Sequence, residues 1–391
     1  MNQSTSIRPF SGWMHRALVT GNHEATNTHI PLDEEYWLAL RHPAEVEAVG
    51  RELLAAGDPL FLGRKEHEQN QLWRELRSYI RQAEGFYRGA SVLPWKSSPL
   101  NFYYSIMNLA KAITVAKGGL NPQAVEEPRR LHHGLAARVV AGKPDEWRLS
   151  VGTEDGVFSR LYQASVGMPV PDHAVIDGRQ LLGYLGDITW QLDKSGNSDF
   201  KAWFPCKWVI AVGTGEYWDV VAVPRRVPVD RLPPSLGDAY DELAVDAVKE
   251  FAAVTLGLHA IQAGHYRFLQ RKVPIKTDPS GNLNGAALDR LLRESMPNCV
   301  FDCPTAVEHH FAIGLPYASN TGPLPMNELV AAYAVMYFLS SLVRYHPAYL
   351  DKIGETPDAW LIESFAKSAP LTLLRHLTSL VLGYSLVIES A

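Results

Sequence analysis

The chain has 391 residues, of which 46% are hydrophobic and 20% are charged, as in an ordinary globular protein. This length is enough for two or three domains with cores of normal size. The net charge of −5 argues against a surface that coats nucleic acid broadly, while a local basic patch remains compatible with it.

The sequence predicts a protein of the cytoplasm with no membrane association. The most apolar segment, 329–343, follows Asn327 and Glu328 and precedes Arg344, so we expect a buried helix there. Residues 1–16 lack the apolar core of a signal peptide. The 3 cysteines are too few for a disulfide framework and suit a reducing compartment.

The first part of the chain predicts an irregular arm followed by helices. The arm covers residues 1 to about 40 and is expected to end in a helix at 33–40. Apolar residues on one face then predict a helix at 43–56.

Two helices joined by a short loop are predicted between residues 72 and 119. Apolar residues recur along the first helix at the spacing of one buried face: Trp73, Leu76, Ile80, Ala83, Tyr87 and Ala90. Pro94 interrupts the pattern, Ser98 can cap the second helix, and Pro99 suits its first turn. The second helix is expected to end near Gly118 and to bury Leu100, Tyr103, Tyr104, Met107 and Ala110.

The second of these helices also carries a polar row. Asn101, Ser105 and Asn108 share a face, and Lys111 lies one step beside them. An amide and an ammonium beside a tyrosine-rich face need partners once they leave water. The row predicts either a polar site between helices or a hydrogen-bonded helix contact from which Lys111 reaches solvent.

Short β-branched segments predict a small β-containing region at 146–237. We expect strands at 147–151 and from Val157, joined by a turn, and a second pair at 208–212 and 218–223. Residues 178–192 between the two pairs are predicted to be helical.

The C-terminal part, 238–391, is predicted to be helical again. Helices are expected at 238–271 and from Met326 onward, separated by a loop-rich segment. The predicted fold is therefore α+β and predominantly helical. A helical hairpin within 1–145 packs with the C-terminal block, and the β-containing region is an insertion between them.

Arginine and histidine gather just after the predicted hairpin. Arg129 and Arg130 precede His132 and His133. Histidine exchanges protons near neutral pH, and arginine holds a phosphate through two hydrogen bonds. A metal-free ribonuclease needs both properties. Alternatively, these residues decorate a helix end, where positive charge meets the helix dipole favourably.

A second polar group is expected where the two helical blocks meet. Arg344 ends the long apolar helix, and His346 follows it. If the blocks pack together, Arg344 approaches Tyr104, Asn108 and Lys111. These residues would then form a pocket for a phosphate, a nucleotide or a carboxylate. A structural network between helices explains the same residues.

No metal site and no cofactor are expected. Cys299, Cys303, His309 and His310 lack the paired spacings that are usual for zinc ligands.

Three segments resemble the YaaC-like family of bacterial proteins: FYYSIMNLAKA, the HGL that follows it, and NELVAAYAVMYFLSSLVRYHP. The first also resembles a HEPN-type helical hairpin. That resemblance implies a fold found in many ribonucleases and in inert partners of nucleotidyltransferases and defence proteins. Active HEPN ribonucleases carry an arginine followed a few residues later by a histidine. In the matching segments here, arginine and histidine lie too close together for that pattern, which favours a non-catalytic role.

We therefore expect a non-catalytic interaction or ligand-sensing component of a bacterial multi-protein assembly, tied to anti-phage defence or to nucleotides. Its expected partner is another protein or a second copy of itself, and its expected ligand is RNA or a nucleotide. The alternative is an atypical, metal-independent HEPN-type ribonuclease that uses His132 or His133 with Arg129 or Arg130.

Overall fold

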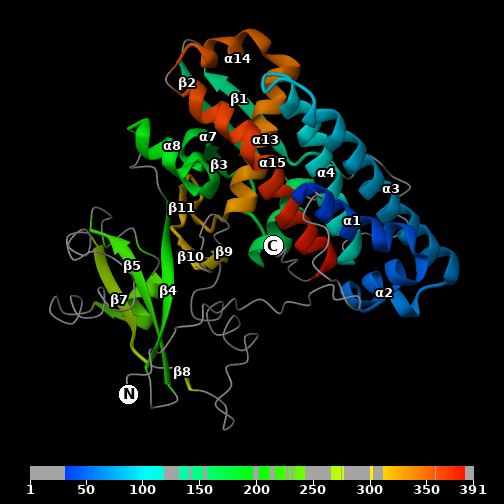
Figure 1. The fold of residues 1–391 in the computed structure, drawn as a ribbon, viewed down its shortest axis with the longest axis horizontal. Coiled ribbons are helices and arrows are strands. Elements are labelled where there is room, and N and C mark those ends of the chain that lie inside the picture. Colours follow the sequence, from blue (N-terminus) through cyan, green and yellow to red (C-terminus); the bar gives the residue numbers. More distant parts are fainter. Residues whose placement is uncertain are drawn as a thin grey trace. The chain divides into compact units, whose positions relative to one another are not determined.

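A computed structural model gives the fold (Figure 1). It describes residues 31–118, 132–140, 143–152, 156–196, 202–211, 216–225, 229, 232, 234–242, 266–273, 275–276, 300–302, 311–356 and 358–383. The described elements confirm an α+β, predominantly helical fold. The chain divides into two compact units. The larger unit comprises His15–Lys201, Ser319–Leu324 and Glu328–Ala391, and the smaller comprises Met1–Met14, Ala202–Ala318 and Pro325–Asn327.

The larger unit contains most of the helices. They are α1 (Leu32–Glu45), α2 (Glu47–Gly57), η1 (Phe61–Gly63), α3 (Glu66–Ser91), α4 (Ser98–Ala116), α6 (Val157–Val166), α7 (Gly178–Leu181), η3 (Leu182–Tyr184), η4 (Gly186–Ile188), α8 (Thr189–Lys194), α13 (Glu328–Tyr345), α14 (Pro347–Gly354) and α15 (Ala359–Leu382). The helix expected from Pro43 is wrong at its start, because α1 continues through Pro43 and α2 begins only at Glu47.

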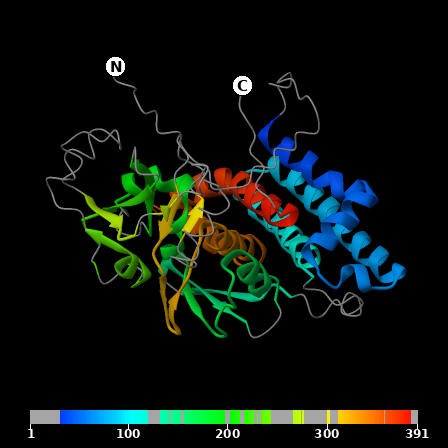
Figure 2. The ribbon, with the colours of Figure 1, turned by 90° about the horizontal axis from the view of Figure 1, so that it is seen from below.

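Helices α3 and α4 form the predicted antiparallel hairpin and lie side by side in Figures 1 and 2. Tyr87 meets Phe102 near the connecting loop, with ring centroids 5.3 Å apart, and Ser105 donates a hydrogen bond to the Ala83 carbonyl further along. All six residues predicted for the buried face of α3 are buried. On α4 the prediction is confirmed for Tyr103, Met107 and Ala110, whereas Leu100 and Tyr104 are half-buried.

The start of α4 differs from the expectation in one respect. The residue before the helix is Ser97, and no side chain caps the first turn, so the predicted Ser98 cap is wrong. Ser98 is instead a buried residue of the helix itself. Pro99 does occupy the first turn, as predicted.

The C-terminal helices pack on the hairpin, as predicted. Both α13 and α15 contact α4, and α13 also contacts α15. The apolar segment 329–343 lies within α13 and is mostly buried, which confirms the predicted core helix. Among the described residues, no helix has the length and apolar character needed to cross a bilayer.

A buried polar group joins these C-terminal helices to η4. Glu328 on α13 accepts a hydrogen bond of 2.7 Å from the Gly186 amide, and its other oxygen lies 3.2 Å from Nε2 of His376 on α15. Asp187 accepts a hydrogen bond from the Thr372 hydroxyl. Burial, followed by the charge of Glu328, raises the pKa of Asp187. The group satisfies polar side chains in a largely apolar core.

A small sheet completes the larger unit. Its strands β1 (Leu135–Val140), β2 (Lys143–Val151) and β3 (Val175–Asp177) are antiparallel and lie in the order β1-β2-β3. The Trp147 ring of β2 stacks on Phe338 of α13 at 4.4 Å. The sequence predicted a strand at 147–151 in a separate insertion starting at residue 146 and did not predict β1 or β3. Contacts group all three strands with the helices up to Lys201.

The strand expected from Val157 is wrong, because this segment begins α6. The apolar residues Val157, Phe158, Leu161 and Tyr162 repeat at helical spacing and are all buried. Gly167 ends the helix in a left-handed conformation, with φ of 84°. The expected helix at 178–192 is interrupted, since the chain forms four short helices from α7 to α8.

The described part of the smaller unit is mainly one antiparallel sheet. Its strands are ordered β6-β7-β5-β4-β10-β9, with β8 pairing to β5. The elements are β4 (Trp203–Ala211), β5 (Glu216–Pro224), α9 (Pro234–Ala239), β6 (Tyr240–Glu242), β7 (Tyr266–Arg271), β8 (Ile275–Lys276), β9 (Val300–Asp302) and β10 (Phe311–Gly314). The hairpin of β4 and β5 was predicted. A separate two-stranded sheet contains β11 (Tyr317–Ser319) and β12 (Gly322–Leu324), of which Ser319–Leu324 is assigned to the larger unit.

The helix expected over 238–271 is wrong for most of its described residues, because only 238–239 are helical, at the end of α9. Residues 240–242 form β6 and residues 266–271 form β7, which pair with each other. Phe268 is buried, and the buried Arg271 guanidinium lies over the Tyr240 ring at 5.3 Å. The segment between these strands lies outside the described residues.

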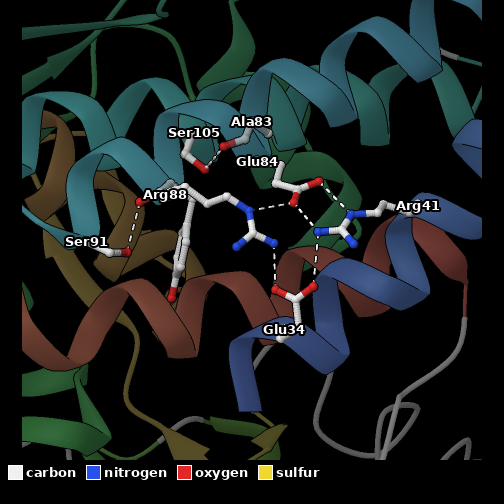
Figure 3. A network of polar contacts seen from close by, with 8 residues as sticks. Glu34, Arg41, Ala83, Glu84, Arg88, Ser91 and Ser105 are labelled. Carbon is white, nitrogen blue, oxygen red and sulfur yellow. Dashed lines mark hydrogen bonds and ion pairs between the residues drawn. The ribbon is translucent and has the colours of Figure 1, made fainter. Parts of the chain in front are cut away.

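An ion-pair network fastens α1 to α3 (Figure 3). Glu84 of α3 accepts hydrogen bonds from Arg41 at 2.9 Å and from Arg88 at 2.7 Å. Glu34 of α1 accepts from the same two arginines, at 3.1 and 2.6 Å. The Glu84 side chain is only 13% exposed. The hydrogen bond from Arg41 is the main cause that lowers the pKa of Glu84.

We expect Glu84→Gln to lower the free energy of unfolding by about 2 kcal/mol at pH 7, because two arginines lose a shared, mostly buried carboxylate. Since the folded pKa of Glu84 is lowered, its contribution is present above the ordinary pKa of 4.5 and is lost as pH falls through the folded value. Urea unfolding should therefore show a smaller difference between the two proteins in acid.

The matched control for this variant is Glu363→Gln. Glu363 pairs with Lys367 four residues away in an exposed position. Its loss should change stability by less than about 0.5 kcal/mol. Equal effects of the two substitutions would show that the network does not fasten α1 to α3.

Candidate functional site

Aromatic side chains from α4 and α13 meet a histidine just before β1. The Tyr103 hydroxyl lies 2.8 Å from Nδ1 of His133 and 3.5 Å from the Tyr333 hydroxyl. The Tyr103 ring also meets the Tyr337 ring edge-on, with centroids 5.3 Å apart. We refer to Tyr103, Tyr333, Tyr337 and His133 as the tyrosine–histidine cluster. It joins three segments that lie far apart in the sequence.

Backbone hydrogen bonds hold the histidine segment in place. The amides of Val157 and Phe158, at the start of α6, donate to the carbonyls of His132 and His133 at 2.8 and 3.2 Å. The Tyr337 hydroxyl donates to the Leu135 carbonyl at 2.7 Å. The segment is therefore tied to α6 on one side and to α13 on the other.

Two glycines make this approach of backbones possible. Gly134 has φ of 78°, in the left-handed region that side chains disfavour. A Cβ atom on Gly156 would lie 2.3 Å from the Gly134 Cα atom. Only glycine fits at position 156 without moving the segment that carries His132 and His133.

Two cations lie near the cluster. Arg344, near the end of α13, donates a hydrogen bond of 2.9 Å to the Tyr104 hydroxyl. Lys111 of α4 lies over the Tyr79 ring, with Nζ 5.6 Å from its centroid. Among the described residues, no carboxylate forms an ion pair with Arg344. One cation of the site thus has a phenol rather than an acid as its partner.

Burial and neighbouring charges keep His133 and Tyr103 of the cluster in their uncharged forms. Burial lowers the pKa of His133 below its ordinary 6.5, and the charges of Lys111, Arg344 and His132 lower it further. Burial also raises the pKa of Tyr103 well above its ordinary value. At pH 7 the imidazole and the phenol are therefore both uncharged and share one hydrogen bond.

Burial lowers the pKa of Lys111 as well, against the opposing charge of Glu75. Part of the lysine charge is thus balanced, and Arg344 is the cation of the site without an acidic neighbour among the described residues. An anion that entered here would meet positive charge and tyrosine hydroxyls.

The structure brings together four of the predicted site residues. Tyr104 and Arg344 are hydrogen-bonded, and Lys111 and Arg344 both act on His133. The hydrogen bond between Arg344 of α13 and Tyr104 of α4 connects the two helical blocks that the sequence predicted to pack together.

The other predicted residues take different places. Asn108 is 4% exposed and donates to the Tyr104 carbonyl within α4. His132 is exposed, and its Nδ1 accepts a hydrogen bond from the Gly134 amide. His346 is exposed and immediately precedes α14. Arg129 and Arg130 lie outside the described residues.

Sequence reasoning did not assign Tyr103, Tyr333 and Tyr337 to the site. Tyr103 was expected to be a buried residue of its helix, and Tyr333 and Tyr337 lie in the segment that was expected to be a buried helix. The available signal was the four-residue step between Tyr333 and Tyr337, which places both hydroxyls on one side of α13.

The described residues offer no candidate metal site. Within them, no group of three His, Cys, Asp or Glu side chains could hold a metal ion. Cys299, Cys303, His309 and His310 all lie outside that part of the chain.

Comparison with known families gives one match. The YaaC-like Protein family matches residues 62–227 and 247–381, which is most of the chain. The matched ranges include every residue of the tyrosine–histidine cluster, together with Tyr104, Lys111 and Arg344. No curated protein and no solved structure matches the chain. The resemblance to a HEPN hairpin stays a prediction.

We expect Gly156→Ala to lower the free energy of unfolding by about 3 kcal/mol, because the new methyl group overlaps the Gly134 backbone. NMR titration of the folded variant should also show the His133 pKa moving toward 6.5, since its buried position is disturbed. The control is Gly85→Ala, where nothing lies within 4 Å on α3. It should raise stability by about 0.5–1 kcal/mol. A Gly156→Ala protein as stable as wild type would contradict the close approach.

Proposed function

The chain belongs to the YaaC-like family, and we propose that it is a non-catalytic, ligand-sensing protein that binds an anion beside the tyrosine–histidine cluster. The observation that carries this proposal is Arg344. Its guanidinium is hydrogen-bonded to the Tyr104 hydroxyl, and the described residues offer it no carboxylate. Burial lowers the pKa of His133, and the charges of Lys111 and Arg344 both lower it further, so both cations act on the cluster.

An anion would complete this arrangement chemically. Arginine binds phosphate and carboxylate through several N–H donors in one plane, and the bond to Tyr104 occupies only one nitrogen. Hydrogen bonds between charged groups are roughly twice as strong as those between neutral ones. A phosphate-bearing ligand therefore fits the site better than a neutral molecule.

Binding here would act on the architecture of the larger unit. The site contains residues of α4, α13 and the segment before β1, so a ligand held by two of them stabilises their packing by mass action. In this proposal the stabilised form is recognised by another protein, or by a second copy of this chain, in a cytoplasmic assembly tied to phage defence or nucleotide metabolism.

Arg344→Gln should weaken binding of inorganic tripolyphosphate at least about tenfold, because a charge-assisted contact to the anion is lost. Calorimetric titration at low salt measures the dissociation constant. The matched control is Arg74→Gln on α3, where the arginine is exposed and has no ion pair within the described structure. Wild-type protein that binds no anion, or a control variant that loses as much affinity, would overturn the proposal.

The second candidate function is a metal-independent HEPN-type ribonuclease. One observation favours it: His133 is held neutral next to two cations, which is the form that a general base requires. His132 is exposed beside it. Arg129 and Arg130 would contact the phosphate in this alternative.

If this alternative holds, wild-type protein cleaves a mixed RNA panel in the presence of a chelator. A His132→Ala/His133→Ala double variant should then lose at least about a hundredfold in rate, since general acid–base catalysis contributes that much. His67→Ala, an exposed histidine in the first turn of α3, is the control and should keep full activity. Absence of cleavage by wild-type protein would eliminate the ribonuclease.

A further inference from the structure

One aromatic side chain beside the site is exposed. Tyr345, the last residue of α13, is 61% exposed. Its ring lies next to Arg344, with the guanidinium carbon 5.0 Å from the ring centroid. Tyr345 is thus an exposed ring that lies against an arginine without an acidic partner among the described residues, so a ligand can reach both the ring and the cation.

The position of Tyr345 relative to the site is fixed by two neighbours. Arg344 contacts the Tyr345 ring and donates to the Tyr104 hydroxyl, so the guanidinium joins the exposed ring to the half-buried tyrosine. Burial raises the pKa of Tyr337, and Tyr345 raises it further, so Tyr345 also acts on a member of the tyrosine–histidine cluster. The exposed ring is therefore the outer rim of the proposed anion site.

We propose that the anion bound at Arg344 is the phosphate chain of a nucleoside phosphate, whose base stacks on Tyr345. This inference rests on the proposed function, because it requires an anion beside Arg344.

The order of groups along the site matches the order of groups in such a ligand. A nucleoside phosphate has a planar base at one end and a polyanionic chain at the other. The site has the exposed Tyr345 ring, then the Arg344 guanidinium over it, and then the Tyr104 hydroxyl to which Arg344 donates. A base stacks on an aromatic ring whatever its identity. The Arg344 guanidinium already lies over the Tyr345 ring and adds a cation–π contribution. Inorganic phosphate or a simple carboxylate would leave the Tyr345 ring in water.

The experiment compares two ligands that differ in the base. ATP and inorganic tripolyphosphate are titrated separately into wild-type protein and into three variants, without added divalent cations. Tyr345→Leu removes the ring, and Tyr345→Phe keeps the ring without the hydroxyl. Trp190→Leu is the control, because Trp190 is 62% exposed on α8, in the same range as Tyr345.

We expect ATP to bind wild type more tightly than tripolyphosphate does. Tyr345→Leu should weaken ATP binding about tenfold, the range for loss of one stacked base, and leave tripolyphosphate binding within about twofold. Tyr345→Phe and Trp190→Leu should bind both ligands as wild type does.

Two results would overturn the inference while the proposed anion site stands. One is equal affinity of wild type for the two ligands, and the other is a Tyr345→Leu variant that keeps its affinity for ATP. If wild type binds neither ligand, both the proposed function and this inference fail.

Discussion

Helix α4 is enclosed by other helices, and the polar side chains it carries must therefore find partners inside the protein. It contacts α3, α6, α13 and α15, and most of its residues are buried. Ser105 donates to a carbonyl of α3, while Asn108 and Thr114 donate to carbonyls of their own helix. Backbone acceptors within the hairpin thus satisfy this part of the polar row.

The hydroxyls of Tyr103 and Tyr104 are too far from the α4 backbone to be satisfied in this way. A tyrosine hydroxyl lies at the end of a long rigid ring, so it reaches past its own helix. Tyr103 meets His133, and Tyr104 meets Arg344. Because α4 is buried, these two hydroxyls require partners from other segments. The candidate site is where α13 and the segment before β1 supply those partners.

The arginines of the larger unit differ in whether carboxylates already pair with their charge. Arg41 and Arg88 each contact two carboxylates, Glu34 and Glu84, and their charge is fully used in joining α1 to α3. Arg344 has a phenol and an aromatic ring as partners. A cation that the described fold leaves without an acid retains its electrostatic attraction for a ligand.

Hydrophobic spacing predicted the elements that are long enough to show a period. Helix α3 buries one apolar face, and α13 is an apolar helix that is buried along most of its length. The hairpin of β4 and β5 followed from two short β-branched segments. Val157 and Phe158 were assigned to a strand because two apolar residues fit either period, and only the packing of α6 on α4 and α13 decides between them. Packing also decides that β1–β3 belong to the larger unit, which no local pattern encodes.

The candidate site was predictable only in part, for a related reason. Arg344 ends an apolar helix, which marks it as a cation at the edge of the core, and its approach to α4 followed from the packing of the two helical blocks. The roles of Tyr103, Tyr333 and Tyr337 were not predictable, because helical spacing shows that residues share a face but not what that face meets. Their partner His133 belongs to a segment held by α6 and α13 backbone and side-chain contacts.

One ring nitrogen of His133 is already engaged within the cluster. The Nδ1 atom of His133 is engaged by Tyr103, whose raised pKa prevents the phenol from acting as a base near neutral pH.

Burial lowers the pKa of His133, and the charges of Lys111 and Arg344 lower it further. An anion bound at Arg344 would offset that charge and raise the His133 pKa toward its ordinary value. Ligand binding and protonation of His133 are then thermodynamically linked, so that each favours the other. His133 is tied through its backbone to α6 and through Tyr103 to α4, and a change in its charge therefore acts on the contacts that hold the larger unit together.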